Sequence, residues 1–190
     1  MRVSLKPFDR ATIELAFERL GELACKAGKI VEISVYGGSA LVLTTDFRIG
    51  TQDVDAVFEN DRTFVRQAAG LVAEEFGWHA DWINDGVKGF LSTQDANAAS
   101  KILFRTYPAE HEPGLRVFVA TPAYLFAMKC LAMRLGGAQE NSDVTDIRKL
   151  GAELGIRSAQ DAFEVVSRYY PLARLSPKTQ FGLEEIFGIN

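Results

Sequence analysis

Apolar residues recur at three- and four-residue spacing in several stretches of the chain, and this spacing predicts helices that bury one face. The first predicted helix runs from about residue 9 to residue 27, and Gly28 ends it. Another covers residues 62–76 and ends at Gly77. After Thr121 the remaining chain is predicted to be helical, with glycine and proline between helices over residues 122–135, 142–154, 158–170 and 177–187.

Alternation of apolar and polar residues predicts strands in the first 120 residues. These strands cover residues 31–36, 53–58, 101–107 and 115–120. The last two are expected to pair through a connection over residues 108–114. In the second strand, Asp53 and Asp55 project from the same face as Val57.

The order of these elements indicates the fold class. Strands and helices are mixed in the first part of the chain, whereas the last part is helical throughout. We expect an α/β (α+β) fold, with a mixed sheet flanked by helices in residues 1–120. Residues 121–190 are expected to form a helical C-terminal subdomain packed on this core. The length of 190 residues suits one domain with a modest extension.

Composition limits the partners and the location. The net charge is -4 and the pI is about 5.3, which argues against the broad basic surface of a duplex-DNA-binding protein. The charge balance does not argue against a local basic patch that binds an RNA end. Cys25 and Cys130 lie among apolar helical residues and are expected to be buried, reduced thiols. No apolar run reaches membrane length, so we expect a cytoplasmic protein without a membrane partner.

The run Gly37-Gly38-Ser39 directly follows the first predicted strand, and residues 40–43 are expected to form a short helix behind it. Glycines let a backbone approach a phosphate without an intervening Cβ. Amides at a helix start, together with the helix dipole, favour an anion there. Ser39 could donate one further hydrogen bond. Taken alone, the run is more often an ordinary tight turn.

The Asp53 and Asp55 carboxylates add a second observation. Two residues apart on a strand, they project from one face at about 7 Å spacing. Unpaired neighbouring carboxylates repel each other and raise each other's pKa, so a cation between them is favourable. Mg²⁺ prefers one or two carboxylates plus phosphate oxygens and water. The pair beside the glycine turn therefore predicts a Mg²⁺ (or Mn²⁺) site that binds an NTP; the alternative is an exposed acidic strand face.

These motifs carry a resemblance to a known family. Residues 36–41 (YGGSAL) and 48–55 (RIGTQDVD) resemble the signature of the nucleotidyltransferase superfamily, which has a polymerase-beta-like fold. The second run is similar to the bacterial AbiEii-type branch of toxin–antitoxin and abortive-infection proteins and its uncharacterised relatives. Residues 124–129 (YLFAMK) and 143–147 (DVTDI) resemble that branch's helical lysine and aspartate motifs. Residues 82–88 (WINDGVK) resemble a segment common in the uncharacterised relatives.

The resemblance implies an enzyme that moves an NMP from an NTP to a hydroxyl of an RNA, a protein or a small molecule. A tRNA or other RNA end is one acceptor that it implies, and a cognate antitoxin protein is one partner. The residues that match are, for the nucleotide, Gly37, Gly38, Ser39, Arg48 and Thr51; for catalysis, Asp53, Asp55 and Lys129, with both aspartates as metal ligands; and, as additional candidates, Asn84, Asp85, Lys88, Asp143 and Asp146.

Two of these assignments have a structural alternative. Lys129 lies in a mostly apolar helix, where a lysine usually needs an anionic partner, and Asp146 is one candidate for that partner. Such a pair would be structural rather than catalytic. Asp143 and Asp146 are also typical of acids near a helix N-terminus, with Ser142 as the N-cap.

One departure from the family opens a second functional hypothesis. Active members usually carry a third carboxylate on a later strand, and neither residues 101–107 nor residues 115–119 contain an acid. Asp85 could take the place of this third carboxylate from its loop, but no spacing argument requires it to do so. The alternative is therefore a weakly active or inactive module that binds nucleotide or a partner protein. A glycosyltransferase is disfavoured, because only 52 residues precede Asp53.

Overall fold

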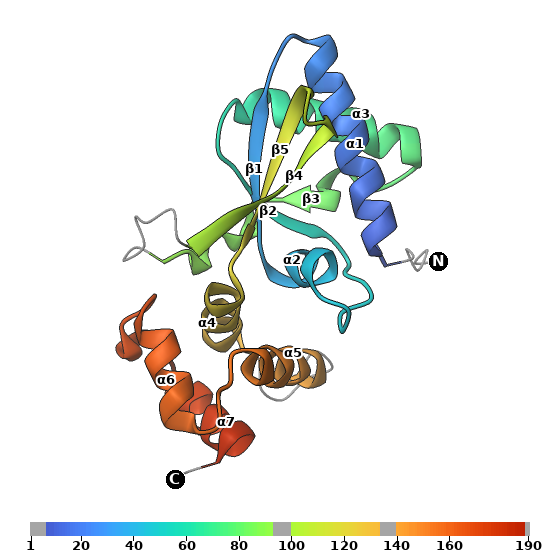
Figure 1. The fold of residues 1–190 in the computed structure, drawn as a ribbon. Coiled ribbons are helices and arrows are strands. Elements are labelled where there is room, and N and C mark those ends of the chain that lie inside the picture. The colour runs from blue at the N-terminus through green and yellow to red at the C-terminus, as the bar shows by residue number, and fades with distance from the viewer. Residues whose placement is uncertain (1–6, 93–99, 134–139, 189–190) are drawn as a thin grey trace. The chain divides into compact units, whose positions relative to one another are not determined.

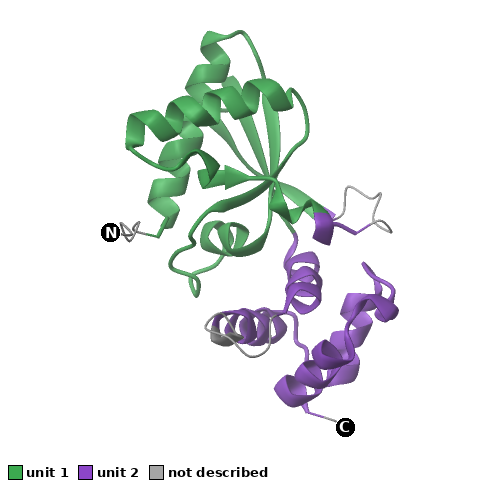
Figure 2. Cartoon of the chain, turned by 180° about the vertical axis from the view of Figure 1, so that it is seen from behind, with its two compact units in different colours: residues 1–88, 101–120 green, residues 89–100, 121–190 purple. Residues whose placement is uncertain are grey.

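The computed structural model describes residues 7–92, 100–133 and 140–188. It forms two compact units (Figure 2). Unit 1 comprises residues 1–88 and 101–120, and unit 2 comprises residues 89–100 and 121–190. The predicted domain boundary after residue 120 stays a prediction. Each unit is described by itself below.

Unit 1 contains a mixed sheet (Figure 1). Its helices and strands are, in chain order, α1 (Arg10–Lys26), β1 (Val31–Val35), α2 (Gly37–Thr44), β2 (Val54–Phe58), α3 (Arg62–Phe76), β3 (Ile83–Asn84), β4 (Lys101–Ala109) and β5 (Glu112–Ala120). Within the described residues, the strand order is β3-β2-β1-β5-β4. Strand β1 is antiparallel to β2 and parallel to β5, β2 is parallel to β3, and β4 is antiparallel to β5. The predicted mixed sheet flanked by helices is confirmed.

Helix α1 covers β4 and β5. Its N-cap Asp9 accepts a hydrogen bond from the Thr12 N–H at 2.8 Å, which satisfies one of the free amides of the first turn. A Cβ on Gly21 would lie only 2.6 Å from the carbonyl oxygen of Tyr107, so helix and hairpin meet backbone to backbone. The buried residues of α1 follow the predicted apolar stripe: Ile13, Ala16, Phe17, Leu20, Gly21 and Ala24.

The sheet has one apolar face and one polar face. On the polar face, Glu32 forms an ion pair with Arg116 across β1 and β5, at 3.2 Å. Glu59, directly after β2, accepts a hydrogen bond from Lys101 Nζ at 2.6 Å. Asp55 alternates with Val54 and Ala56 along β2 and therefore projects from this polar face. The fully buried residues of β1 on the apolar face are Val31, Ile33 and Val35.

The hairpin of β4 and β5 is longer than predicted. The expected connection over residues 108–114 is wrong, because Pro108 pairs with Pro113 and Ala109 with Glu112 inside the ladder. Prolines and a glycine interrupt the apolar–polar alternation, so the pattern stops where the strands continue. Strand β4 is an edge strand, and an edge tolerates a proline because its missing N–H removes no ladder hydrogen bond.

Unit 2 is helical. Its helices are α4 (Pro122–Ala132), α5 (Glu140–Glu153), α6 (Ala159–Ser167) and α7 (Pro177–Phe187). Helix α5 begins at Glu140, so the predicted N-cap role of Ser142 is wrong. The residues before the first apolar position of α5 are polar, and apolar periodicity gives no signal there. Within the part of the chain that the structure describes, no helix combines the length and hydropathy needed to cross a membrane.

Candidate functional site

The glycine run forms the first turn of α2. Strand β1 ends at Val35, Tyr36 is the extended N-cap residue, and the helix begins at Gly37. The predicted helix over residues 40–43 is therefore too short. Glycine has a low helix propensity, so the sequence pattern places the run before the helix rather than inside it. As a result, the free amides of the helix N-terminus belong to the glycine run itself.

Asp55 lies directly against this turn. Tyr36 N–H donates to the carbonyl oxygen of Asp55 at 2.9 Å, which aligns β2 with the end of β1. Gly37 has φ +60°, and a Cβ there would lie 2.6 Å from Asp55 Oδ2. Only glycine suits both the left-handed conformation and this close approach. The structure thus brings the predicted glycine turn and one predicted carboxylate into contact.

Ser39 joins α2 to β2. Its hydroxyl donates to the Tyr36 carbonyl oxygen at 2.9 Å and accepts a hydrogen bond from the Asp55 N–H at 3.2 Å. Its side chain is buried, with a residue exposure of 1%. The predicted hydrogen bond from Ser39 to a phosphate stays a prediction. In this structure Ser39 positions the turn, and Gly37 and Gly38 are half-buried.

Arg48 and Thr51 reach the same turn from the loop between α2 and β2. A Cβ on Gly38 would lie 3.0 Å from Thr51 Oγ1 and 3.5 Å from Arg48 Nη2. Arg48 Nε donates to the Gly50 carbonyl oxygen at 3.1 Å. Thr51 and Phe8 exchange two backbone hydrogen bonds, at 3.0 and 2.7 Å. The structure therefore places a guanidinium beside the turn, and Phe8, which the sequence did not indicate, anchors the loop.

Asn84 joins the two aspartates from β3. Asn84 is the register partner of Asp55 in the parallel β2–β3 pair. Its Nδ2 donates to Asp53 Oδ2 at 2.9 Å. Asp53, Asp55 and Asn84 are each half-buried. The resemblance singled out Asn84 without a role, and the structure gives it a contact with a predicted metal ligand.

The Asp53 and Asp55 carboxylates are oxygen donors of the kind that a magnesium-type cation takes. Among the described residues, no group of three or more His, Cys, Asp or Glu side chains gathers as a complete metal site. Mg²⁺ does not require one, because it commonly takes one or two carboxylates and completes its shell with phosphate oxygens and water. Asp53 and Asp55 would hold the cation, and the adjacent α2 N-terminus would hold the phosphates.

Asp85 and Lys88 pair with each other. Asp85 Oδ2 accepts hydrogen bonds from Lys88 Nζ and, at 3.1 Å, from Arg66. The Lys88 hydrogen bond is the main cause that holds the pKa of Asp85 below its usual value; desolvation opposes it, and the charges of Lys88 and Arg66 add to it. Asp85 is therefore a carboxylate that ties the segment after β3 to α3.

Lys129, Asp143 and Asp146 form a buried ion cluster in unit 2. Lys129 Nζ lies 2.8 Å from Asp146 Oδ2 and 3.4 Å from Asp143 Oδ1. The Lys129 side chain is only 14% exposed, and the aspartates are 7% exposed or less. Buried charges are costly unless they are paired, so this cluster holds α4 against α5. The expected anionic partner of Lys129 is present, and its catalytic role stays a prediction.

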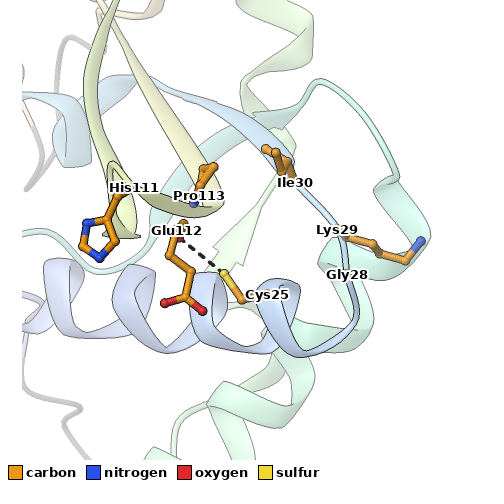
Figure 3. A pocket seen from close by; sticks show the side chains of 7 residues that line it. All are labelled: Cys25, Gly28, Lys29, Ile30, His111, Glu112 and Pro113. Carbon is orange, nitrogen blue, oxygen red and sulfur yellow. Dashed lines mark hydrogen bonds between the residues drawn. The ribbon is translucent and has the colours of Figure 1, made fainter.

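A pocket lies near the start of β1, at the end of the sheet opposite to the glycine turn, and Figure 3 shows the residues that line it. It has a volume of about 330 Å³ and is lined by the end of α1, the segment before β1 and the β4–β5 turn. Cys25 Sγ donates to the Glu112 carbonyl oxygen at 3.5 Å. Desolvation and the charge of Glu112 raise the pKa of Cys25, which keeps it a thiol. The predicted burial is wrong for Cys25, which is half-buried at this pocket, and confirmed for Cys130.

Comparison with known proteins adds little. The sequence matches no family model and no curated protein. Among solved structures, the chain is similar to an antigenic nucleotidyltransferase-like protein from Paracoccidioides brasiliensis, with 13% sequence identity over 97% of each chain and a TM-score of 0.43. A likeness at this TM-score and identity is not evidence of a shared function.

Proposed function

We propose that this protein is a divalent-metal-dependent nucleotidyltransferase that moves an NMP from an NTP to an acceptor hydroxyl. The contact between the Asp55 carboxylate and Gly37 carries the proposal. It sets a carboxylate suited to Mg²⁺ against backbone amides suited to a phosphate. A metal-bound triphosphate would satisfy both groups at once, and neither group alone distinguishes a nucleotide site from an ordinary turn or an acidic strand.

Each part of the site would have a separate task. The amides of Gly37 and Gly38 would hold phosphate oxygens, with the α2 dipole favouring the negative charge. Arg48 would add a positive charge at the same turn. Asp53 and Asp55 would hold Mg²⁺ or Mn²⁺, which when bound neutralises charge on the pyrophosphate leaving group. The chain's contribution to catalysis would be positioning and fixed electrostatics.

The proposal is tested by direct transfer. Purified protein is incubated with Mg²⁺ and each labelled NTP, with tRNA, total cell protein or a small alcohol as acceptor. We expect label on one acceptor class and release of pyrophosphate. Asp55→Asn should abolish both, whereas Asp46→Asn, which removes an exposed carboxylate in the loop after α2, should retain them. No label transfer and no NTP loss under any condition would exclude catalysis.

A second function is favoured by the polar face of the sheet. Ser34 and Phe118 are register partners on β1 and β5, on the same face as Asp55, and neither supplies an acid. The Glu59 carboxylate, which lies beside Ser34, accepts hydrogen bonds from Ser34 and Lys101. Glu112 of β5 lies at the far end of the strand. This arrangement suits a module that binds nucleotide without turnover. It predicts Mg²⁺-dependent thermal stabilisation by NTP, by about 2.7 kcal/mol at a hundredfold excess over Kd, without product.

The motif resemblance extends the first proposal to a toxin with an RNA acceptor and a cognate antitoxin. Induced expression in a bacterial host should then arrest growth. The Asp55→Asn variant should not arrest growth, because it lacks a metal-binding carboxylate. Equal growth with both proteins, at equal soluble expression, would reject the toxin proposal and leave the transfer proposal to its own assay.

A further inference from the structure

Asn84 lies beside the candidate metal site, and its side-chain amide is hydrogen-bonded through both its oxygen and its nitrogen. The Gly86 N–H donates to Asn84 Oδ1 at 2.9 Å, and Asn84 Nδ2 donates to Asp53 Oδ2 at 2.9 Å. An amide oxygen must accept the N–H, so the NH₂ group must face Asp53. Asn84 therefore offers Asp53 a donor, and its oxygen accepts the Gly86 N–H.

The residues on both sides of Asn84 are anchored. Trp82 is fully buried, and its Nε1 donates to the Ala69 carbonyl oxygen of α3 at 3.0 Å. On the other side, Asp85 is tied to α3 by Arg66 at 3.1 Å. Asn84 itself belongs to β3 and pairs with β2. Strand and helix contacts thus fix the position from which the amide reaches Asp53.

The contact with Asn84 gives a physical reason for glycine at position 86. A Cβ at Gly86 would lie 2.9 Å from Asn84 Oδ1, closer than a carbon and an oxygen can approach without a shift. A side chain there would push the amide away from the Gly86 N–H. Gly89, in the same 3-10 segment (Gly86–Phe90), has open space where its Cβ would stand. An alanine side chain would therefore disturb the Asn84 amide from position 86 but not from position 89.

We propose that Asn84, held by Gly86, is the positioning residue that orients Asp53 as a metal ligand. The inference rests on the proposed metal site. A donor on Oδ2 fixes the carboxylate rotamer and leaves Oδ1 for the cation. A ligand held in place before binding loses less conformational freedom when the cation arrives. Removing such a supporting hydrogen bond in metal sites typically costs about 10–100-fold in metal affinity.

The test measures binding of Mn²⁺ alone, by electron paramagnetic resonance on the full chain, for the wild type and five variants. Asn84→Ala and Gly86→Ala should each weaken Mn²⁺ binding about tenfold, and Asp53→Asn should weaken it further. Gly89→Ala is the control for Gly86→Ala. Asn60→Ala is the control for Asn84→Ala, because Asn60 also makes two hydrogen bonds, to Glu32 N at 2.9 Å and Ile30 O at 3.3 Å, at the other end of β2. Both controls should bind Mn²⁺ like the wild type.

Thermal unfolding of every variant separates positioning from a general loss of structure. Mn²⁺ affinity is compared at a temperature where all variants are folded. Wild-type affinity in Asn84→Ala, or an equal loss in Asn60→Ala, would overturn the inference. Equal Mn²⁺ binding by Asp53→Asn and the wild type would overturn it too, because Asn84 would then orient no ligand. Normal Mn²⁺ binding without nucleotidyl transfer would instead refute only the proposed activity.

Discussion

The Gly37–Asp55 contact leaves no room for a side chain at position 37, and replacing Gly37 with alanine tests its role in the site. The change has two separable effects. Gly37 has φ +60°, a conformation that an L-residue adopts at a cost. The added Cβ would also lie 2.6 Å from Asp55 Oδ2, where ordinary contact begins at 3.4 Å. The carboxylate must then move, because the Gly37 backbone is held by β1 and α2.

The magnitudes follow from these two numbers. The left-handed conformation costs about 1–2 kcal/mol for alanine. In a chain of this length that corresponds to a Tm decrease of roughly 2–8 °C. To reach ordinary contact, Asp55 Oδ2 must retreat by about 0.8 Å, the difference between the two distances. A misplacement of about 1 Å in a catalytic site can cost roughly a hundredfold in rate.

Three measurements on Gly37→Ala check this reasoning: the Tm, the Mn²⁺ affinity and the rate of nucleotidyl transfer. Gly77→Ala is the matched control. Gly77, the C-cap residue of α3, has φ +68°, and its Cβ would meet nothing within 4 Å. Gly77→Ala should therefore show a similar decrease in Tm and unchanged Mn²⁺ binding. Gly37→Ala should show that decrease together with weaker Mn²⁺ binding and about 10–100-fold slower transfer.

The result that would refute the reasoning is a Gly37→Ala protein that resembles the Gly77→Ala control in all three measurements. The carboxylate and the turn would then be independent, and the contact that carries the proposed function would have no role in it. Weaker Mn²⁺ binding by both variants would refute the reasoning as well, because it would trace the loss to general instability.

Three further predictions concern stability. Lys129→Met should lower the free energy of unfolding by about 3–5 kcal/mol in urea denaturation, because it leaves two buried carboxylates without their ammonium partner; a change below 1 kcal/mol would show that the cluster is not structural. Desolvation raises the pKa of Glu59, but the hydrogen bonds from Lys101 and Ser34, together with the charges of Lys101 and Arg62, outweigh it, so the pKa is lowered. A carboxyl group whose pKa is lower in the folded state stabilises the fold above its unfolded pKa of 4.5, and this contribution is lost as the pH falls through the folded-state pKa. Glu59→Gln should therefore lower the free energy of unfolding at pH 7 and lower it much less at acid pH. An effect that does not depend on pH would contradict this sign. A Cβ on Gly114 would lie 2.0 Å from the Gly21 carbonyl oxygen, so Gly114→Ala should separate α1 from the hairpin and lower the Tm by several degrees, whereas a normal Tm would show that the helix moves freely.

Local patterns predicted most of the elements. The apolar stripe of α1 and the alternation in β2 depend only on the repeat of helix and strand, so their positions agree with the structure to within a residue or two. The ends of elements were harder to predict. The first turn of α2 consists of glycine and serine, and α5 begins with polar residues, so apolar periodicity gave no signal at either start.

The sequence by itself determined that a glycine turn follows β1 and that Asp55 lies on one face of the next strand, since both properties are local. The prediction that Asp53 belongs to the same strand is wrong, because β2 begins at Val54 and Asp53 lies just before it. Only the tertiary structure decided that Asp55 touches Gly37 and that Asn84 donates to Asp53. The partners in these contacts lie far apart along the chain, and strand pairing brings them together. Pairing depends on which apolar faces pack, on β1 lying between β2 and β5, and on β3 joining the edge of β2. No repeat in the sequence specifies such pairing, because it is set by packing over the whole sheet.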